Sequence, residues 1–165
     1  MKKYLFLFLF VFLSQFLIGQ DNENCKIYFI RHAEKVLDDS PDPLLTEIGE
    51  ERAIHWANVF KNVAFDAVYS TNTLRTVATS LPTAEQNDLQ IILYDATTID
   101  ITEIAEMNKG KTILVVGHSN STPFLVNALI GEERYPEIED DNYSNLYIAT
   151  YTQNNTDVTL LYIEL

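Results

Sequence analysis

Short apolar runs alternate along the chain with longer segments in which apolar residues recur every three or four positions. The short runs lie at residues 26–30, 67–69, 91–94 and 112–116. Continuous apolar runs of this length are typical of strands that are covered on both faces in a parallel sheet. Because helical segments separate them, the pattern predicts an α/β fold with a mostly parallel central sheet.

The helical segments carry recognisable start and stop signals. Thr46 can cap a helix whose apolar stripe includes Ile48, Trp56 and Phe60. A helix follows each of the next two predicted strands, the first with apolar positions Leu74, Val77, Ala78 and Leu81, and the second at residues 99–107. The last helix is predicted to follow the cap residues 119–122, to place Pro123 at its first position, and to end at Gly131.

The C-terminal part has a different pattern. Two alternating runs at residues 146–151 and 158–163 flank Asn154 and Asn155, which predicts a hairpin at the sheet edge. The fold class expected is therefore a three-layer sandwich, with a mostly parallel sheet between helices and a C-terminal antiparallel edge hairpin. The length of 165 residues suits one domain with a single core.

The first residues differ from the rest. Lys2 and Lys3 precede a nearly continuous apolar run at residues 4–18, which is shorter than the roughly 20 residues of a bilayer span. This predicts a signal peptide at residues 1–20, followed by the folded domain at residues 21–165. We expect the protein to be exported, to the periplasm or the extracellular space, without stable membrane association after cleavage.

Charge and cysteine content exclude several partners and chemistries. The formal net charge is −13, or −15 without Lys2 and Lys3, which argues against nucleic acid as a partner. Any site for an anionic phosphate must therefore depend on a local group of basic side chains. Cys25 is the one cysteine, so the chain cannot form an internal disulfide.

Basic and imidazole side chains follow the predicted strands. Arg31 and His32 come after the first strand, His118 comes after the fourth, and Arg75 lies in the first turn of a helix between them. The carboxyl ends of parallel strands meet at one edge of a sheet, where ligands bind. Arginine matches phosphate oxygens, and neutral imidazole can attack phosphorus. The residues predict a phosphoryl-transfer site, whereas His55 lies in a helix away from the strand ends.

Several motifs together resemble a known family. The motifs are Arg31-His32-Ala33-Glu34-Lys35, residues 43–49, Tyr69-Ser70-Thr71 with Arg75-Thr76, and residues 115–120 around Gly117-His118. This set is similar to the signature of the histidine phosphatase superfamily, also called phosphoglycerate-mutase-like. The family usually has glycine where this chain has Ala33. The resemblance extends over nearly all of the chain that follows the predicted signal peptide.

The resemblance implies roles for individual residues. His32 corresponds to the nucleophile of the family. Arg31, Arg75 and His118 correspond to residues that bind the phosphoryl oxygens and stabilise the transition state. Lys35 corresponds to a further basic residue that faces the phosphate in several members.

The family also uses a carboxylic acid to protonate the leaving oxygen. Four carboxylates of this chain compete for that role, and Asp100 is preferred over Glu34, Asp95 and Glu103. The acidic run at residues 132–141 lacks the regular alternation and glycine of a calcium loop, and we interpret it as a solvated loop flanking the site.

The function expected is that of an exported phosphatase, of the histidine acid type, which hydrolyses a phosphate monoester through a phosphohistidine on His32. The chain has no His-x-His pair and no cysteine cluster, so we expect neither a metal nor another cofactor. The substrate expected is a phosphorylated small molecule or polypeptide. Two alternatives remain, namely a phosphohistidine or phosphoprotein phosphatase, and a non-catalytic phosphate-binding domain with the same fold.

Overall fold

The computed structural model describes residues 24–165, so the predicted signal peptide lies outside the described residues. Strands and helices alternate over the first two thirds of this range, and two strands follow. In chain order the elements are β1 (Cys25–Arg31), α2 (Glu47–Val59), β2 (Ala67–Thr71), α3 (Leu74–Gln86), β3 (Ile91–Tyr94), α4 (Ile101–Met107), β4 (Thr112–Gly117), α5 (Ser121–Ile130), β5 (Asn145–Tyr151) and β6 (Thr156–Tyr162).

The strands form one six-stranded sheet in the order β3-β2-β4-β1-β5-β6. The strands β1 to β4 run parallel, whereas β5 pairs antiparallel with β1 and β6 pairs antiparallel with β5. In the register of the central strand, Ile27 lies between Ile113 of β4 and Ala149 of β5. The predicted fold class, including the antiparallel hairpin at the edge, is confirmed.

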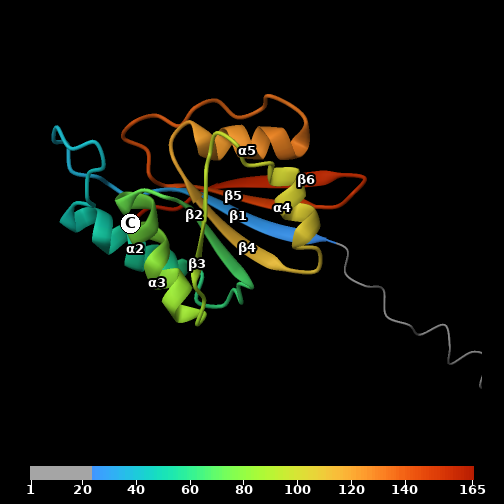
Figure 1. The fold of residues 1–165 in the computed structure, drawn as a ribbon, viewed down its shortest axis with the longest axis horizontal. Helices are drawn as coiled ribbons and strands as arrows, with labels where there is room; N and C mark the ends of the chain where they lie inside the picture. The colour runs from blue at the N-terminus through green and yellow to red at the C-terminus, as the bar shows by residue number, and fades with distance from the viewer. Residues whose placement is uncertain (1–23) are drawn as a thin grey trace, which may run out of the picture.

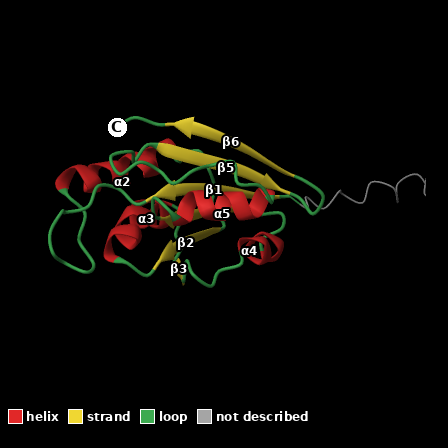
Figure 2. Cartoon of the chain, turned by 90° about the horizontal axis from the view of Figure 1, so that it is seen from above, coloured by secondary structure: helices red, strands yellow, loops and turns green. Residues whose placement is uncertain are grey.

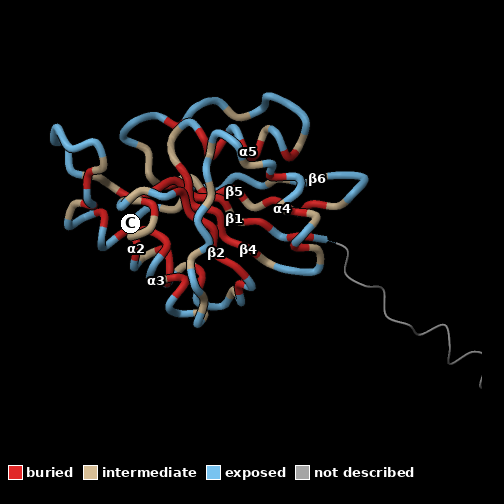
Figure 3. Tube along the Cα trace, viewed as in Figure 1, coloured by how far each residue is buried: buried red, intermediate tan, exposed pale blue. Residues whose placement is uncertain are grey.

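Helices cover both faces of the sheet, with α4 and α5 on one side and α2 and α3 on the other (Figures 1 and 2). Side chains of a strand alternate between faces, so Ile27 and Phe29 of β1 pack in the core under α4 and α5. Ile30 packs instead with Trp56 of α2. Figure 3 shows the buried residues running through the central strands, as expected for a sheet covered on both faces.

The helix starts are fixed by side-chain caps. Thr46 accepts a hydrogen bond from the backbone of Gly49, as predicted for the start of α2. The helix expected at residues 99–107 begins two residues later, because the Asp100 carboxylate accepts from the backbone N–H groups of Thr102 and Glu103. This cap ends the preceding loop and sets the start of α4.

The buried face of α3 differs from its apolar positions in the sequence. Leu74 and Leu81 are 51% and 44% exposed, whereas Thr76, Thr79 and Ser80 are buried. These hydroxyls can be buried because each donates to a backbone carbonyl, of residues 71 and 73, 75, and 77 respectively. Small hydrogen-bonded side chains therefore let α3 lie close to its neighbours.

None of the helices described within residues 24–165 is long and apolar enough to cross a membrane.

Candidate active site

The two histidine motifs meet at the carboxyl ends of adjacent strands. Arg31 ends β1 and lies opposite Gly117, which ends β4. The backbone N–H of His32 donates to the carbonyl oxygen of Gly117 over 2.9 Å. The ring centroids of His32 and His118 are consequently 5.4 Å apart. The sheet register alone brings these two imidazoles together.

Gly117 permits this arrangement because it has no side chain. A Cβ atom at this position would lie 2.8 Å from the Thr122 hydroxyl oxygen and 2.9 Å from that of Ser121. The Ser121 hydroxyl in turn accepts from the backbone N–H of His118. The glycine therefore allows the strand to approach the start of α5 and holds His118 at the sheet rim.

The predicted nucleophile His32 and the four predicted phosphate-binding residues line one cavity of about 370 Å³. Arg75 reaches it from the first turn of α3, which starts beside β2. Residues from the start of α5 and from the following loop complete the wall. The lining residues are Arg31, His32, Lys35, Arg75, His118, Ser119, Asn120, Glu137 and Asp140. We call this space the phosphate cavity.

His32 is held in the form that a nucleophile requires. Its Nδ1 lies 2.7 Å from the carbonyl oxygen of Ala33, and because a carbonyl only accepts, Nδ1 carries the proton. The lone pair is then on Nε2. The pKa of His32 is lowered to about 3, mainly by burial and also by the nearby charges of Arg31, His118 and Arg75, against the opposing effect of the Ala33 hydrogen bond. His32 is therefore neutral at neutral pH.

His118 has a hydrogen-bond partner on each ring nitrogen. Its Nε2 lies 2.9 Å from the hydroxyl oxygen of Thr71, which donates its own proton to Thr76. The Thr71 hydroxyl therefore accepts from Nε2–H, and Nδ1 accepts from the Arg75 guanidinium over 3.4 Å. Burial lowers the pKa of His118 to about 4, and the charge of Arg75 adds to this effect.

Replacing Thr71 by valine is expected to lower kcat/KM for a phosphate ester about tenfold. The change keeps the shape of the side chain but removes a hydrogen bond worth about 1 kcal/mol and leaves Nε2–H without its acceptor. The measurement is steady-state hydrolysis of p-nitrophenyl phosphate. Thr71→Ser is the matched control because it keeps the hydroxyl, and equal activity of all three proteins would contradict the role of this bond.

Arg31 ties the acidic loop to the sheet. Its NH1 donates to the carbonyl oxygens of Glu139, Asp140 and Asn142, over 2.8, 3.1 and 2.9 Å. Its guanidinium also lies over the ring of Tyr143, 4.3 Å from the centroid. The side chain is only 4% exposed, yet its Nε has no hydrogen-bond partner. The interpretation of residues 132–141 as a loop flanking the site agrees with this geometry.

Arg75 is oriented by a residue that the sequence reasoning did not consider. Asp42 accepts from the backbone N–H of Leu74 and forms an ion pair of 3.2 Å with NH1 of Arg75. The Asp42 carboxylate thus caps the start of α3 and also orients the Arg75 side chain. The sequence signal at this position is the group of aspartates and prolines within residues 38–43, which indicates a loop and no more.

None of the four carboxylates proposed as proton donors lines the phosphate cavity. Glu34 is bound by Arg52 through contacts of 2.7 and 2.9 Å. Asp95 accepts from both the backbone and the hydroxyl of Thr97, which lowers its pKa, although it lines a neighbouring cavity with His118. Glu103 is exposed on α4.

Asp100, the preferred donor, does not lie among the residues that line the phosphate cavity. A hydrogen bond to Glu106 raises the pKa of Tyr151 most, and the charge of Asp100 adds to this rise, so Asp100 lies near Tyr151. Tyr151 pairs with Cys25, at the start of β1, whereas His32 follows its end. The structure therefore gives Asp100 a capping position away from the phosphate cavity, whose own carboxylates, Glu137 and Asp140, sequence reasoning missed.

Asp100→Ala is expected to lower the free energy of unfolding by about 1 kcal/mol, because the N-cap of α4 is lost, and to leave kcat unchanged. Asp100→Asn should preserve both, since asparagine caps as well as aspartate. Urea unfolding and p-nitrophenyl phosphate hydrolysis measure the two effects. A large loss of kcat in both variants would restore Asp100 as the proton donor.

No group of three or more histidine, cysteine or acidic side chains that could hold a metal ion occurs within residues 24–165. The side chains that face the phosphate cavity include three cations, Arg31, Lys35 and Arg75. In the described part of the chain, the charge available to a phosphoryl group is therefore supplied by these side chains.

The fold and the paired histidine motifs define a class of phosphoryl-transfer proteins. Residues 27–97 match the model of the histidine phosphatase superfamily, branch 1, and this segment contains Arg31, His32 and Arg75. The predicted resemblance to the histidine phosphatase superfamily is confirmed. A search of curated proteins found no match.

Solved structures with the same fold cover most of this chain at low sequence identity. The protein histidine phosphatase SixA, complexed with tungstate, is 21% identical with a TM-score of 0.69, and the match covers 83% of this chain and 96% of SixA. Phosphoserine phosphatase from Entamoeba histolytica, in complex with phosphoserine, is 17% identical with a TM-score of 0.66, at 82% and 95% coverage. Phosphoglycerate mutase from Bacillus anthracis is 16% identical with a TM-score of 0.69, at 86% and 94% coverage.

Proposed function

We propose that this protein is a phosphatase that transfers the phosphoryl group of a phosphate monoester to His32 and then to water. The observation that carries the proposal is the neutral His32 imidazole, whose Nδ1 donates to Ala33 and whose Nε2 is left for the phosphate cavity. A neutral imidazole among cations is the arrangement that nucleophilic attack on a dianionic phosphoryl group requires.

In the first step, the Nε2 lone pair attacks phosphorus, and the bond between phosphorus and the ester oxygen breaks with its electron pair going to that oxygen. The leaving oxygen takes up a proton from solvent and departs as an alcohol. In the second step, a water oxygen attacks phosphorus, the P–N bond breaks with its electron pair returning to Nε2, and a proton of the attacking water passes to solvent. The products are the alcohol, inorganic phosphate and the original neutral His32, so the sum is the hydrolysis of one ester bond.

The cations around the cavity stabilise the charge on the transferring group. Arg31 and Arg75 each have an Nε that is buried without a hydrogen-bond partner, and Lys35 lines the same cavity. Fixed donors of this kind stabilise a phosphoryl group without reorganising during the reaction. In this proposal His118, whose two ring nitrogens are bonded to Thr71 and Arg75, positions the Arg75 guanidinium at the cavity.

The substrate in this proposal is a phosphorylated small molecule or polypeptide. The relatives named above are described as acting on protein phosphohistidine, phosphoserine or phosphoglycerate, so the shared fold supports several substrate classes. The SixA likeness supports the alternative of a phosphohistidine phosphatase. Phosphohistidine is a better leaving group than an alkoxide and needs less assistance from an acid.

The deciding assay is hydrolysis of p-nitrophenyl phosphate by the purified chain from residue 21, with and without EDTA. We expect phosphate release in both conditions, because the charge in the cavity is supplied by arginine and lysine side chains. Loss of activity with EDTA would refute the metal-independent mechanism. Inactivity towards p-nitrophenyl phosphate and a panel of phosphate esters and phosphohistidine would refute the phosphatase itself and leave a phosphate-binding domain.

We also propose that the protein is exported and that residues 1–20 are removed. Support comes from the basic start and the apolar run of the sequence, which precede the described residues. N-terminal sequencing of the protein recovered from the cell envelope and the medium tests this. A mature protein that retains Met1 in the cytoplasm would contradict export.

A further inference from the structure

Carboxylates stand where a phosphate site would be expected to have none. Glu137 and Asp140 line the phosphate cavity together with the three cationic side chains. Their positions are fixed, because the backbone N–H of Ile138 donates to the carbonyl oxygen of Ser119 and the Ser119 hydroxyl donates to Glu137. Arg31 holds the backbone of Asp140. A carboxylate beside a dianionic phosphoryl group weakens its binding unless the substrate also carries a cation.

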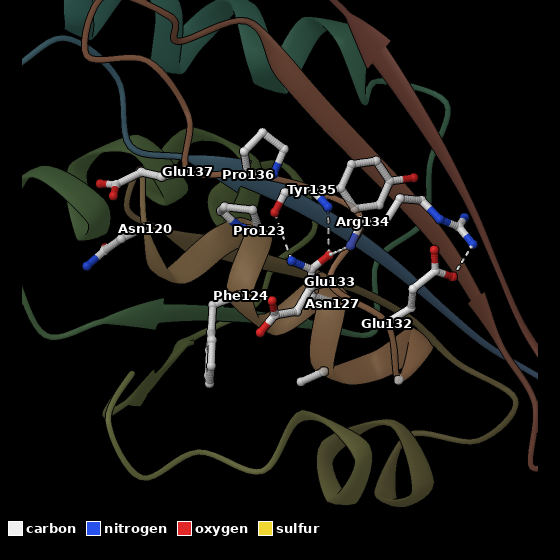
Figure 4. A pocket seen from close by; sticks show the side chains of 12 residues that line it. Asn120, Pro123, Phe124, Asn127, Glu132, Glu133, Arg134, Tyr135, Pro136 and Glu137 are labelled. Atoms are coloured by element: carbon white, nitrogen blue, oxygen red, sulfur yellow. Dashed lines mark hydrogen bonds and ion pairs between the residues drawn. The ribbon is translucent and has the colours of Figure 1, made fainter.

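A larger groove of about 660 Å³, whose lining side chains are drawn in Figure 4, lies along α5 and includes Glu137. Asn120 and Glu137 line both spaces, so the groove continues from the phosphate cavity. Its opposite wall is held by Asn127, whose side chain donates to the carbonyl oxygen of Tyr135 and accepts from the backbone N–H groups of Arg134 and Tyr135. The groove is thus a built surface of α5 and the following loop.

The charge of this groove is negative. Arg134, its one basic lining residue, is paired with Glu132 over 3.0 Å. Glu133 and Glu137 form no ion pair among the described residues, although the charge of Glu137 also acts on Arg31 in the adjoining phosphate cavity. The lining of the groove thus has three carboxylates, of Glu132, Glu133 and Glu137, against the one cation Arg134. Phe124 is 63% exposed and presents its ring at the same groove. Carboxylates beside an exposed aromatic ring suit an ammonium group, which both attract.

A second cavity beside the phosphate, about 570 Å³ in volume, suits an ammonium group less well. It is lined by the cations Arg31 and Lys35 and by the carboxylates of Glu34, Asp140 and Asp141. Because Glu34 is paired with Arg52, the two cations are balanced by two free carboxylates, and the cavity has no excess of negative charge for an ammonium group. Of the two openings, the groove along α5 is the one whose charge complements a cationic leaving group. Arg31, which is 4% exposed and lines the phosphate cavity, fixes where the anionic end of such a molecule binds.

We propose that the preferred substrate is a small phosphate monoester whose alcohol carries an ammonium group, bound with the phosphate between Arg31 and Arg75 and the ammonium group beside Glu137 in the α5 groove. This inference rests on the proposed phosphatase function and adds the class of the leaving group. The net charge of −13 supports it, since a zwitterionic ester is repelled less at long range than an anionic one.

The test compares phosphocholine with 3,3-dimethylbutyl phosphate, in which carbon replaces the quaternary nitrogen without changing the shape. Two exposed carboxylates acting on one cation are expected to give phosphocholine an advantage of about tenfold in kcat/KM. The advantage should shrink in 0.5 M sodium chloride, because salt screens exposed charges. This salt measurement uses the wild-type protein and does not depend on any variant folding.

The variant Glu133→Gln/Glu137→Gln should lower the phosphocholine advantage to about twofold or less, since it removes both carboxylates and keeps their size. The matched control is Glu85→Gln/Asp88→Asn, which removes the same charge at the far end of α3 and should keep the tenfold advantage. Thermal unfolding of each protein confirms that it is folded.

The outcomes separate the two levels of the proposal. If the wild-type protein hydrolyses p-nitrophenyl phosphate but treats the paired esters equally, the ammonium site is refuted and the phosphatase function stands. A tenfold advantage that survives in Glu133→Gln/Glu137→Gln refutes the assignment to this groove. If no ester, p-nitrophenyl phosphate included, is hydrolysed, the proposed function itself fails.

Discussion

His32→Ala is expected to lower kcat for p-nitrophenyl phosphate at least about a thousandfold, because it removes the atom that attacks phosphorus. Nothing else described in the cavity can replace it. His118 has its Nε2 bonded to Thr71, and its Nδ1 faces Arg75. The remaining cations could still bind phosphate without cleaving an ester. The variant should therefore lose turnover while retaining affinity for inorganic phosphate.

The measurement combines steady-state rates with trapping of the intermediate. Rapid acid-free quenching of the wild-type protein with ³²P-labelled substrate should leave label on the chain as an acid-labile phosphohistidine, whereas His32→Ala should carry none. His55→Ala is the matched control, since His55 lies on α2 beside Trp56 and outside the phosphate cavity. Full activity in His32→Ala, or label lost equally from the His55 variant, would contradict the assignment of the nucleophile.

The second large effect concerns stability and pH. The folded protein keeps His32 and His118 neutral, with pKa values lowered by burial to about 3 and about 4, whereas each has a pKa near 6.5 in an unfolded chain. Below pH 6.5 the unfolded chain therefore binds protons that the folded chain does not. The free energy of unfolding should fall as pH decreases, by about 2 kcal/mol for each histidine between pH 6.5 and 5.

Urea unfolding at pH 7 and pH 5, in a buffer without phosphate, measures this loss. The double variant His32→Gln/His118→Gln should lose much less stability over the same interval, because its site has no group to protonate in the unfolded state. Comparing how the free energy of unfolding changes with pH in the two proteins separates the contribution of the two histidines from that of the carboxylates. Parallel pH profiles for wild type and variant would contradict the lowered pKa values.

The four parallel strands were predictable from short apolar runs and the C-terminal hairpin from two alternating runs, and the capping residue Thr46 predicted the start of α2. The face of α3 was not predictable from hydrophobicity. Its leucines are exposed, and the hydroxyls of Thr76 and Thr79 are buried, because hydrogen bonds to backbone carbonyls offset the cost of burying them. Which hydroxyls can donate to a backbone carbonyl depends on how the helix packs, and the pattern of apolar and polar residues does not carry this information.

The residues of the site also differ in whether the sequence could predict their positions. Arg31, His32 and His118 follow strand ends, so parallel topology alone predicts that they meet. Asp42 and Glu137 come from loops whose path depends on long-range contacts, and their composition indicated only solvated turns. Asp100 was misleading because a carboxylate just before a helix serves equally well as a cap or as a catalytic acid. The backbone hydrogen bonds of α4 decide between these uses.

The order of the strands leaves β3 and β6 at the two margins of the sheet, each with one row of backbone groups open to another chain. Both margins also expose apolar side chains, including Ile92, Leu93, Leu160 and Leu161. Such margins invite strand pairing between molecules. The net charge of −13 opposes that encounter, because like-charged molecules repel each other before their sheets can pair. Conditions that neutralise carboxylates should therefore favour intermolecular sheets.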